Sequence, residues 1–187
     1  SPIKNWQMVL GYIISSILIG ILMSLITFIF AEVYIVIYGG EIVSFFAMLK
    51  LLGFIILSVS SSSALVFFIV TLIKSQNAFG TASTILGTLI GFLTGVYIPI
   101  GALPSAVQTV IKIFPVSHSA VLLRQTMMNE VVSLDNLPQE FLTELGIKYI
   151  VFDKIFPVWG HILVLILSMV LFYGLAILVV SRKKAIV

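Results

Sequence analysis

Four long stretches of this chain, residues 5–31, 51–73, 75–111 and 155–181, contain no Asp, Glu, Lys or Arg. Each stretch reaches or exceeds the roughly 20 apolar residues that an α-helix needs to span a bilayer. Backbone polar groups in hydrocarbon must be hydrogen-bonded within the segment, so apolar runs of this length are expected to be helices. The stretches therefore predict an all-α polytopic membrane protein.

The composition agrees with this fold class and excludes several others. Hydrophobic residues make up 60% of the chain and charged residues 9%, whereas soluble domains carry about 25% charged residues. Residues 51–57 are continuously apolar, which is not the alternating pattern of a membrane β-strand. The absence of cysteine excludes disulfides and Cys-based metal or redox sites. The scattered net charge of +3 does not favour nucleic acid as a partner.

Glycine, proline and polar residues interrupt the apolar stretches and set the expected element boundaries. The stretch 75–111 is 37 residues long, too long for one span, and it is broken at Pro99, Gly101 and Pro104, with Pro115 following. Proline removes a backbone donor and clashes with the preceding turn. We expect one transmembrane domain over 1–187, with four transmembrane helices at about 6–38, 48–74, 78–97 and 156–180, two half-helices at about 103–114 and 116–128, and an exterior loop at 129–154.

The two half-helices allow two interpretations. They form either a re-entrant hairpin that dips into the outer leaflet or one interfacial segment that lies flat on the membrane. In the hairpin interpretation, Pro99, Gly101, Pro104 and Pro115 shape an outer gate. Arg124, at the end of the second half-helix, either offsets the helix dipole, pairs with an exterior carboxylate, or extends to the interface.

The basic residues favour one orientation. Lys4, Lys74 and the Arg182-Lys183-Lys184 end would lie on one side, close to helix ends and without acidic neighbours. The opposite side also carries five basic residues, of which Lys148 and Lys154 lie in the acidic loop 129–154. Because basic residues close to helix ends mark the cytoplasmic side, we expect a multi-pass cell-membrane protein with both ends of this segment in the cytoplasm.

A stripe of small residues runs along the expected helix 78–97. Ser83, Gly87, Gly91 and Gly95 recur every four residues, a spacing that lets a neighbouring helix approach closely. The pattern predicts packing against another helix. A more specific alternative is that the stripe forms the interface between two copies of the protein.

Few residues are suited to chemistry in the membrane. Glu32 is the only carboxylate within an apolar run, so it is a candidate for the substrate path, unless it reaches the outer interface. Ser58, Ser61 and Ser62 belong to a serine cluster that either bonds helix to helix or lines the same path. His118 and His161 appear isolated and lack metal-ligand spacing. No catalytic, cofactor or metal site is predicted, and no GxxxxGK[ST] phosphate loop is present.

Three passages resemble the permease subunits of ABC-2-type exporters. The first is Ser1-Pro2-Ile3 followed by Leu10-Gly11-Tyr12. The second is the run from Thr94-Gly95 to Leu103-Pro104, and the third is the run from Phe114-Pro115 to Leu123-Arg124. They occur in the family's order and spacing, although His118 stands where an aromatic residue is usual.

The resemblance implies a function and a set of partners. The chain would be the C-terminal two-thirds of a permease, with Ser1, Pro2, Ile3 and Lys4 forming part of the contact with a separate ATP-binding ABC subunit. That subunit would hold ATP and Mg²⁺, and a second permease copy or homologue would complete the path through the lipid. Efflux, including multidrug efflux, would be the activity. The alternative is a four-span scaffold or interaction protein without transport activity.

Overall fold

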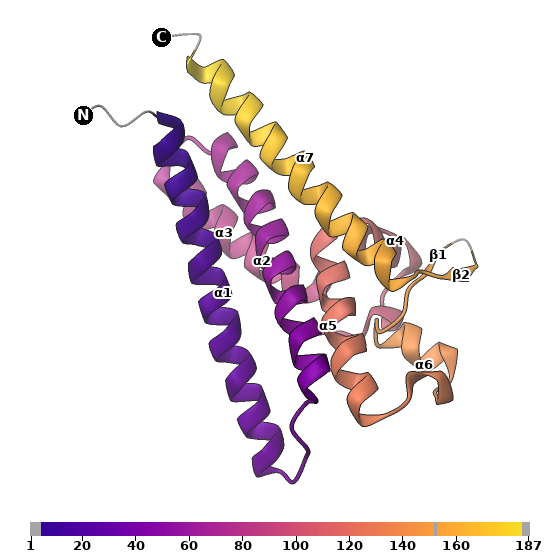
Figure 1. Cartoon of the computed structure of the whole chain (residues 1–187). Helices are drawn as coiled ribbons and strands as arrows, with labels where there is room; N and C mark the ends of the chain where they lie inside the picture. Colours follow the sequence, from indigo (N-terminus) through magenta and orange to yellow (C-terminus); the bar gives the residue numbers. More distant parts are fainter. Residues whose placement is uncertain (1–4, 152, 185–187) are drawn as a thin grey trace.

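The computed structural model describes residues 5–151 and 153–184 and is helical apart from one small hairpin (Figure 1). The elements are α1 (Asn5–Ile37), α2 (Phe45–Leu72), α3 (Gln76–Leu93), η1 (Ile100–Ala102), α4 (Ser105–Ile113), α5 (Pro115–Val131), η2 (Leu134–Asn136), α6 (Gln139–Glu144), β1 (Ile150–Val151), β2 (Lys154–Ile155) and α7 (Val158–Lys184). The predicted all-α polytopic class is confirmed.

Three helices within the described residues are long and apolar enough to cross a membrane. Their candidate spans are Val9–Ile37 in α1, Phe45–Leu72 in α2 and Val158–Ser181 in α7. At 1.5 Å per residue the shortest of these, 24 residues, is about 36 Å long, enough for a hydrocarbon core of about 30 Å. Most large apolar side chains on α1 are exposed, which suits contact with lipid or with further helices.

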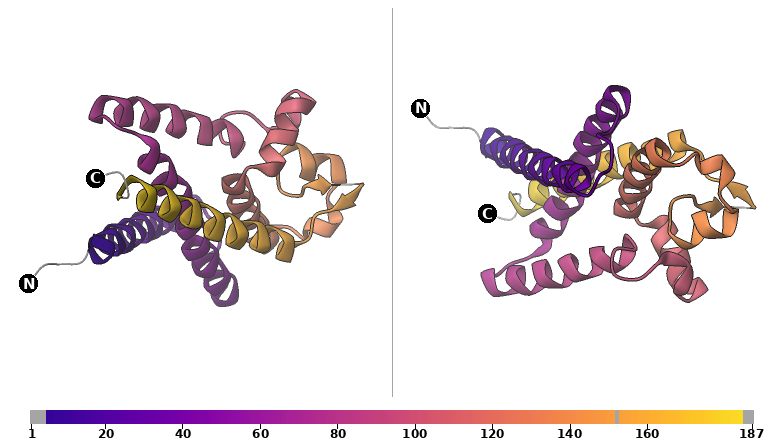
Figure 2. Two further views of the ribbon diagram at one scale, coloured as in Figure 1. Left: turned by 90° about the horizontal axis from the view of Figure 1, so that it is seen from above. Right: turned by 90° about the horizontal axis from the view of Figure 1, so that it is seen from below.

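Helix α2 lies at the centre of the bundle, with α1, α5 and α7 around it (Figure 2). Its buried side chains include Leu51 and Ala64, and α7 contributes Leu165 and Ala176; all four are fully enclosed. Near the C-terminal end of α2, the ring of Phe68 packs beside that of Phe172 of α7, with ring centroids 5.8 Å apart. The α2–α7 contact is therefore the main apolar seam of the fold.

Helices α4 and α5 bend by 87° at the single residue between them, as the proline pattern predicts. Pro115 is the first residue of α5, where its missing N–H costs nothing because the first turn of a helix has no acceptor for it. The same ring prevents α4 from continuing through this point. The predicted break is therefore confirmed, and we call α4 and α5 together the bent pair.

Helix α3 ends four residues before the predicted boundary. The structure ends it at Leu93, and Gly95 then adopts a left-handed backbone with φ +69°, which glycine tolerates best. At 18 residues α3 is shorter and less apolar than the three candidate spans. A membrane crossing by α3 stays a prediction.

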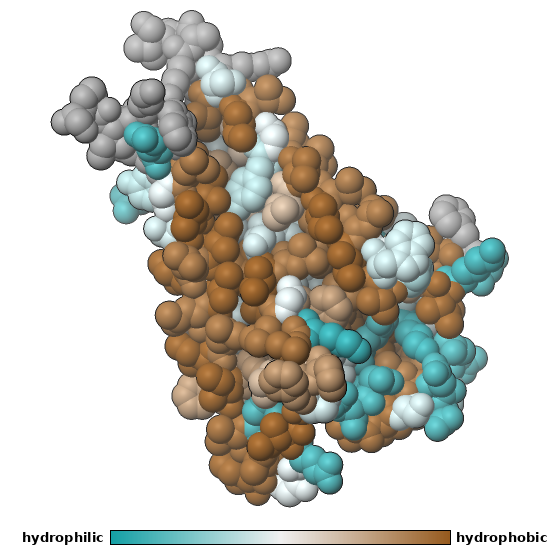
Figure 3. All heavy atoms as spheres, in the orientation of Figure 1, coloured by the Kyte–Doolittle hydropathy of each residue, from teal (hydrophilic) through white to brown (hydrophobic). Residues whose placement is uncertain are grey.

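In the segment predicted as the exterior loop 129–154, a name that we keep for it, residues 129–131 still belong to α5, and the chain then forms η2, the six-residue helix α6 and the antiparallel hairpin β1–β2. Apolar residues continue beyond α6 to Ile150, but the helix ends at Glu144. Gly146 turns left-handed at φ +66°, and the backbone N–H groups of Ile147 and Lys148 both donate to the Leu142 carbonyl. Hydrophilic residues gather around this part of the surface, whereas apolar residues cover the long helices (Figure 3).

Candidate functional site in the bent helix pair

The bent pair lies against the bundle and contains two of the five predicted gate residues, Pro115 and Arg124. Helix α5 packs on both α2 and α7, and α3 also contacts it. Pro99 precedes η1 and Pro104 precedes α4, so each predicted proline stands at the start of a new helical segment. The Pro104 carbonyl accepts hydrogen bonds from Val107 and Gln108, 2.9 and 3.0 Å away. These prolines set where the segments begin.

Gly101 is required by a close approach between η1 and α6. A Cβ at this position would lie 2.7 Å from the Cα of Glu144, so no side chain can be added without moving α6. The sequence singles out Gly101 as part of a chain break, and the structure gives the more specific reason. This contact joins the start of the bent pair to the exterior loop.

Arg124 joins two separate loops to α5. Its Nη2 donates to the Gly95 carbonyl at 3.1 Å and its Nη1 to the Leu145 carbonyl at 3.3 Å. The next residue, Gln125, donates from Nε2 to the Ile147 carbonyl at 2.7 Å. Arg124 lies in the middle of α5 rather than at a helix end, because α5 continues to Val131. None of the three predicted roles for Arg124 matches these two carbonyl contacts.

His118 of α5 and His161 of α7 are in direct contact, so their apparent isolation in the sequence is wrong. Their Nδ1 atoms lie 2.7 Å apart, and the two residues are 2% and 0% exposed. The His118 Nε2 lies 2.9 Å from the Lys112 carbonyl. No feature of the sequence pairs two histidines 43 residues apart; only the fold brings them together. We call them the histidine pair.

The contacts of the histidine pair determine which nitrogens carry protons. A carbonyl only accepts, so His118 donates from Nε2, and in a neutral ring its Nδ1 is then the acceptor. His161 must therefore donate from Nδ1, which leaves its Nε2 as an acceptor. That Nε2 is buried and makes no well-formed hydrogen bond within the described residues. Each ring thus relies on the other for its orientation.

Aromatic side chains surround the histidine pair. The rings of Tyr149 and Phe156 lie 5.7 Å from His118, and that of Phe156 lies 4.9 Å from His161. Burial raises the pKa of Tyr149 above its usual range, so its phenol remains neutral near pH 7 and brings no anion to the pair. Within the described residues, no group of three or more His, Cys, Asp or Glu could hold a metal ion.

Two carboxylates hold the start of α2. Glu32 Oε2 accepts a hydrogen bond from the Val43 N–H at 3.2 Å, and Glu130 Oε2 accepts one from the Ser44 N–H at 2.9 Å. The Ser44 hydroxyl in turn caps α2 by accepting from the Ala47 N–H. Negative groups are favourable at a helix N-terminus. Glu32 and Glu130 thereby join α1 and α5 to the same point of α2.

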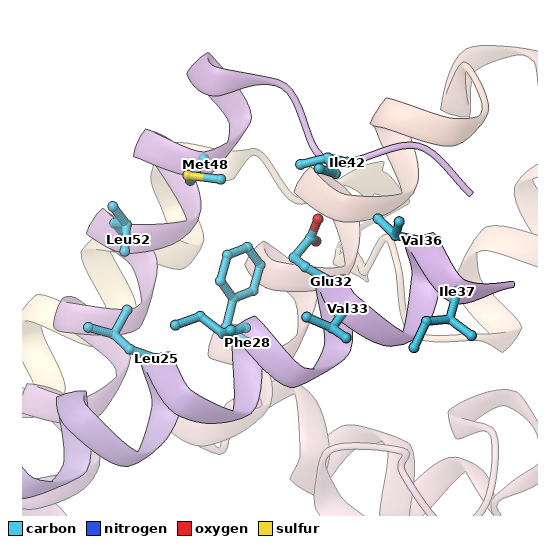
Figure 4. Close-up of a pocket in the computed structure, with 10 residues that line it drawn as sticks. Leu25, Phe28, Glu32, Val33, Val36, Ile37, Ile42, Met48 and Leu52 are labelled. Carbon is cyan, nitrogen blue, oxygen red and sulfur yellow. The ribbon is translucent and has the colours of Figure 1, made fainter. Parts of the chain in front are cut away.

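Glu32 also borders a groove of about 520 Å³ between α1 and α2, where the other lining residues are apolar (Figure 4). In this view the carboxylate points towards the segment that carries Ile42. Glu32 is 8% exposed, and its Oε1 has no partner among the described residues. The structure shows an anchoring contact for Glu32, and its role in a substrate path stays a prediction.

The serine cluster divides between two faces of α2. The Ser61 Oγ lies 2.8 Å from the Ser168 Oγ of α7, as the interhelical interpretation predicts. Ser168 also donates to the Leu165 carbonyl, so Ser61 is the donor between the two hydroxyls. Ser58 instead borders a groove of about 420 Å³ among α1, α2 and α5. Ser62 is half-buried.

Among the described residues, Ser83, Gly87 and Gly91 of the small-residue stripe do not pack closely against another helix. A Cβ at Gly87 would have no neighbour within 4 Å, and Ser83 is exposed. A Cβ at Gly91 would collide with the Tyr97 ring, and Gly95 belongs to the turn after α3. The predicted contact residues Ser1, Pro2, Ile3 and Lys4 lie outside the described residues.

The comparison with family models matches this chain to a transporter family. Residues 1–178 match the model described as ABC-2 family transporter protein. Comparisons with curated proteins and with solved structures found no significant match. The family match covers nearly the whole chain, including the long helices and the bent pair. This chain therefore belongs to the ABC-2 transporter family and serves as a membrane-embedded permease.

Proposed function

We propose that this permease forms the substrate path of an ATP-driven exporter and works with separate ATPase subunits. ATP and Mg²⁺ would bind to those subunits, because this chain lacks a GxxxxGK[ST] phosphate loop. A second permease copy, or a homologue, would complete the path. Residues 1–4 would contribute to the contact with the ATPase on the cytoplasmic side.

The observation that carries the proposal is that α5 of the bent pair is joined to three separate parts of the fold. Through the histidine pair α5 is joined to α7, and through Arg124 it is joined to the loop after α3. Glu130 joins the other end of α5 to the start of α2. A rotation of the long helices would therefore displace α5, as an outer gate requires.

The grooves favour apolar or amphiphilic cargo. The groove that contains Ser58 is bordered mainly by apolar side chains of α1, α2 and α5, with Ser24 and Thr27 as further polar residues. The groove beside Glu32 is also apolar. Largely apolar pockets with few polar groups suit hydrophobic ligands. Export of such molecules, including drugs, is the activity that we infer.

The test uses the full-length permease, purified alone and with its ATPase partner, in lipid vesicles. The lone permease should not hydrolyse ATP, and the complex should hydrolyse ATP and export a fluorescent hydrophobic dye. Replacing both Pro2 and Ile3 with Asp should weaken binding of the ATPase and lower both activities.

The matched control places two new charges in the exterior loop, as Asn136→Asp with Gln139→Asp, and should leave both activities unchanged. ATP hydrolysis by the lone permease would contradict the proposal. Assembly with an ATPase but no ATP-dependent export would favour a scaffold function instead.

A further inference from the structure

A cleft of about 380 Å³ lies where α2, α5, the exterior loop and the first residue of α7 meet. It is separate from the histidine pair and from the grooves along α1. Its apolar wall contains the buried residues Ala47, Leu122 and Leu134, which are 4%, 1% and 6% exposed. Phe54 and Val158 extend this wall. The cleft thus has a buried apolar wall formed by α2, α5 and η2.

The same cleft contains two cations and two anions. Lys50 and Lys148 border it together with Glu130 and Asp135. Lys148 is largely buried, with a side chain 14% exposed, and its Nζ lies 3.5 Å from Asp135 Oδ1. Lys50 lies near enough to Glu130 for the charges to attract. Within the described residues Lys50 has no hydrogen bond or ion pair, so its three donors are available to a ligand.

The position of the cleft corresponds to the boundary between lipid and water. Lys50 is five residues beyond the start of α2 at Phe45, or about 7.5 Å along the helix axis. Trp159, at the start of α7, is 68% exposed, and tryptophan at a helix end is typical of the membrane interface. A lysine at this depth is stabilised by an anionic headgroup.

We propose that this cleft binds the headgroup of a zwitterionic phospholipid that carries a primary amine. The phosphate lies against Lys50 and Lys148, and the ammonium group lies against Glu130 and Asp135. The acyl chains leave along Phe54 and Val158. Equal numbers of opposite charges beside an apolar wall match such a lipid better than a purely anionic or purely neutral one.

The experiment measures lipid binding to the purified full-length permease by native mass spectrometry. The probes are phosphatidylethanolamine, phosphatidylglycerol and diacylglycerol with identical acyl chains. Phosphatidylethanolamine should bind most tightly, because phosphatidylglycerol has no ammonium group and diacylglycerol has no phosphate. Lys50→Gln should weaken phosphatidylethanolamine binding by roughly five-fold, the contribution of one lysine beside lipid headgroups.

Lys154→Gln is the matched control, because Lys154 is an exposed lysine of β2 outside the cleft. It should leave phosphatidylethanolamine binding unchanged, and both variants should keep the wild-type thermal unfolding midpoint. Equal binding of diacylglycerol and phosphatidylethanolamine, or unchanged binding in Lys50→Gln, would overturn the proposal. Soluble phosphoethanolamine that binds as tightly as the lipid would instead assign the cleft to a soluble ligand. These measurements need neither ATP nor the ATPase, so they stand apart from the export proposal.

Discussion

Individual polar side chains in this permease hold distant segments together. Arg124 and Gln125 donate to backbone carbonyls after α3 and after α6. The histidine pair joins α5 to α7 with a single 2.7 Å contact. Such contacts matter in a fold whose helices expose much apolar surface to lipid, because apolar burial between helices gives less specificity there.

The histidine pair should show strong energetic coupling. His118→Leu and His161→Leu each leave one buried nitrogen without its partner, so each should lower the free energy of unfolding by about 1–3 kcal/mol. The double variant removes both nitrogens and should cost clearly less than the sum. Unfolding of the four proteins by SDS in bicelles gives the comparison. Simple additivity of the two losses would show that the imidazoles do not depend on each other.

For individual residues, the sequence identifies several important side chains but does not predict which groups they contact. Arg124 lies in the second half-helix but in its middle rather than at its end, and its carbonyl partners lie 21 and 29 residues away in the chain. The histidines give no signal at all, since a hydrogen bond across 43 residues leaves no local pattern. Ser61 is the exception, because a serine in an apolar helix needs a partner and a neighbouring helix is the usual source.

Helices and breaks follow from local chemistry, so they were largely predictable. Pro115 fixes the bend between α4 and α5, because its ring removes a backbone N–H donor and clashes with the preceding helical turn. Runs without charge locate α1, α2 and α7 to within a few residues. The end of α3 and the shape of the exterior loop were not predictable, because they depend on left-handed glycines at 95 and 146 and on contacts with Arg124 and Leu142.

Helix α3 provides a test of the small-residue stripe. Among the described residues, a Cβ at Gly87 would have no neighbour within 4 Å, whereas one at Gly91 would collide with the Tyr97 ring. If the stripe is a seam between copies, Gly87→Leu should reduce copy-to-copy cross-linking in membranes while leaving the unfolding of the single chain unchanged.

Leu89→Ile is the control for this test, because it replaces one exposed branched residue of α3 with another. It should leave the cross-linking yield at the wild-type level. Full cross-linking of Gly87→Leu would show that Gly87 does not face a second copy.

At the scale of the whole molecule, the long helices and the exterior loop indicate that the protein exposes different segments on the two sides of the membrane. The chain is a multi-pass membrane protein, and charge near the helix ends favours cytoplasmic termini. Cysteine introduced at Asn136 should react with a membrane-impermeant thiol reagent in intact cells. Cysteine introduced at Ser75, between α2 and α3, should be protected until the cells are opened. Labelling of Ser75→Cys from outside would reverse the proposed orientation.

The central claim is that the bent pair gates export, and Pro115→Ala tests it most directly. Alanine restores a backbone N–H that can donate to the Ile111 carbonyl. With Pro115 in place, this carbonyl accepts hydrogen bonds from the Phe114 N–H and from the Ser117 hydroxyl. The bend should then relax towards a continuous helix. The measurement is ATP-driven dye export per folded permease, with its ATPase partner, in lipid vesicles.

Pro115→Ala should lower this export severalfold while ATP hydrolysis continues. Pro138→Ala, a proline change in the exterior loop before α6, should leave export near the wild-type rate. Unchanged export in a folded Pro115→Ala permease would contradict the assignment of the bent pair as the outer gate.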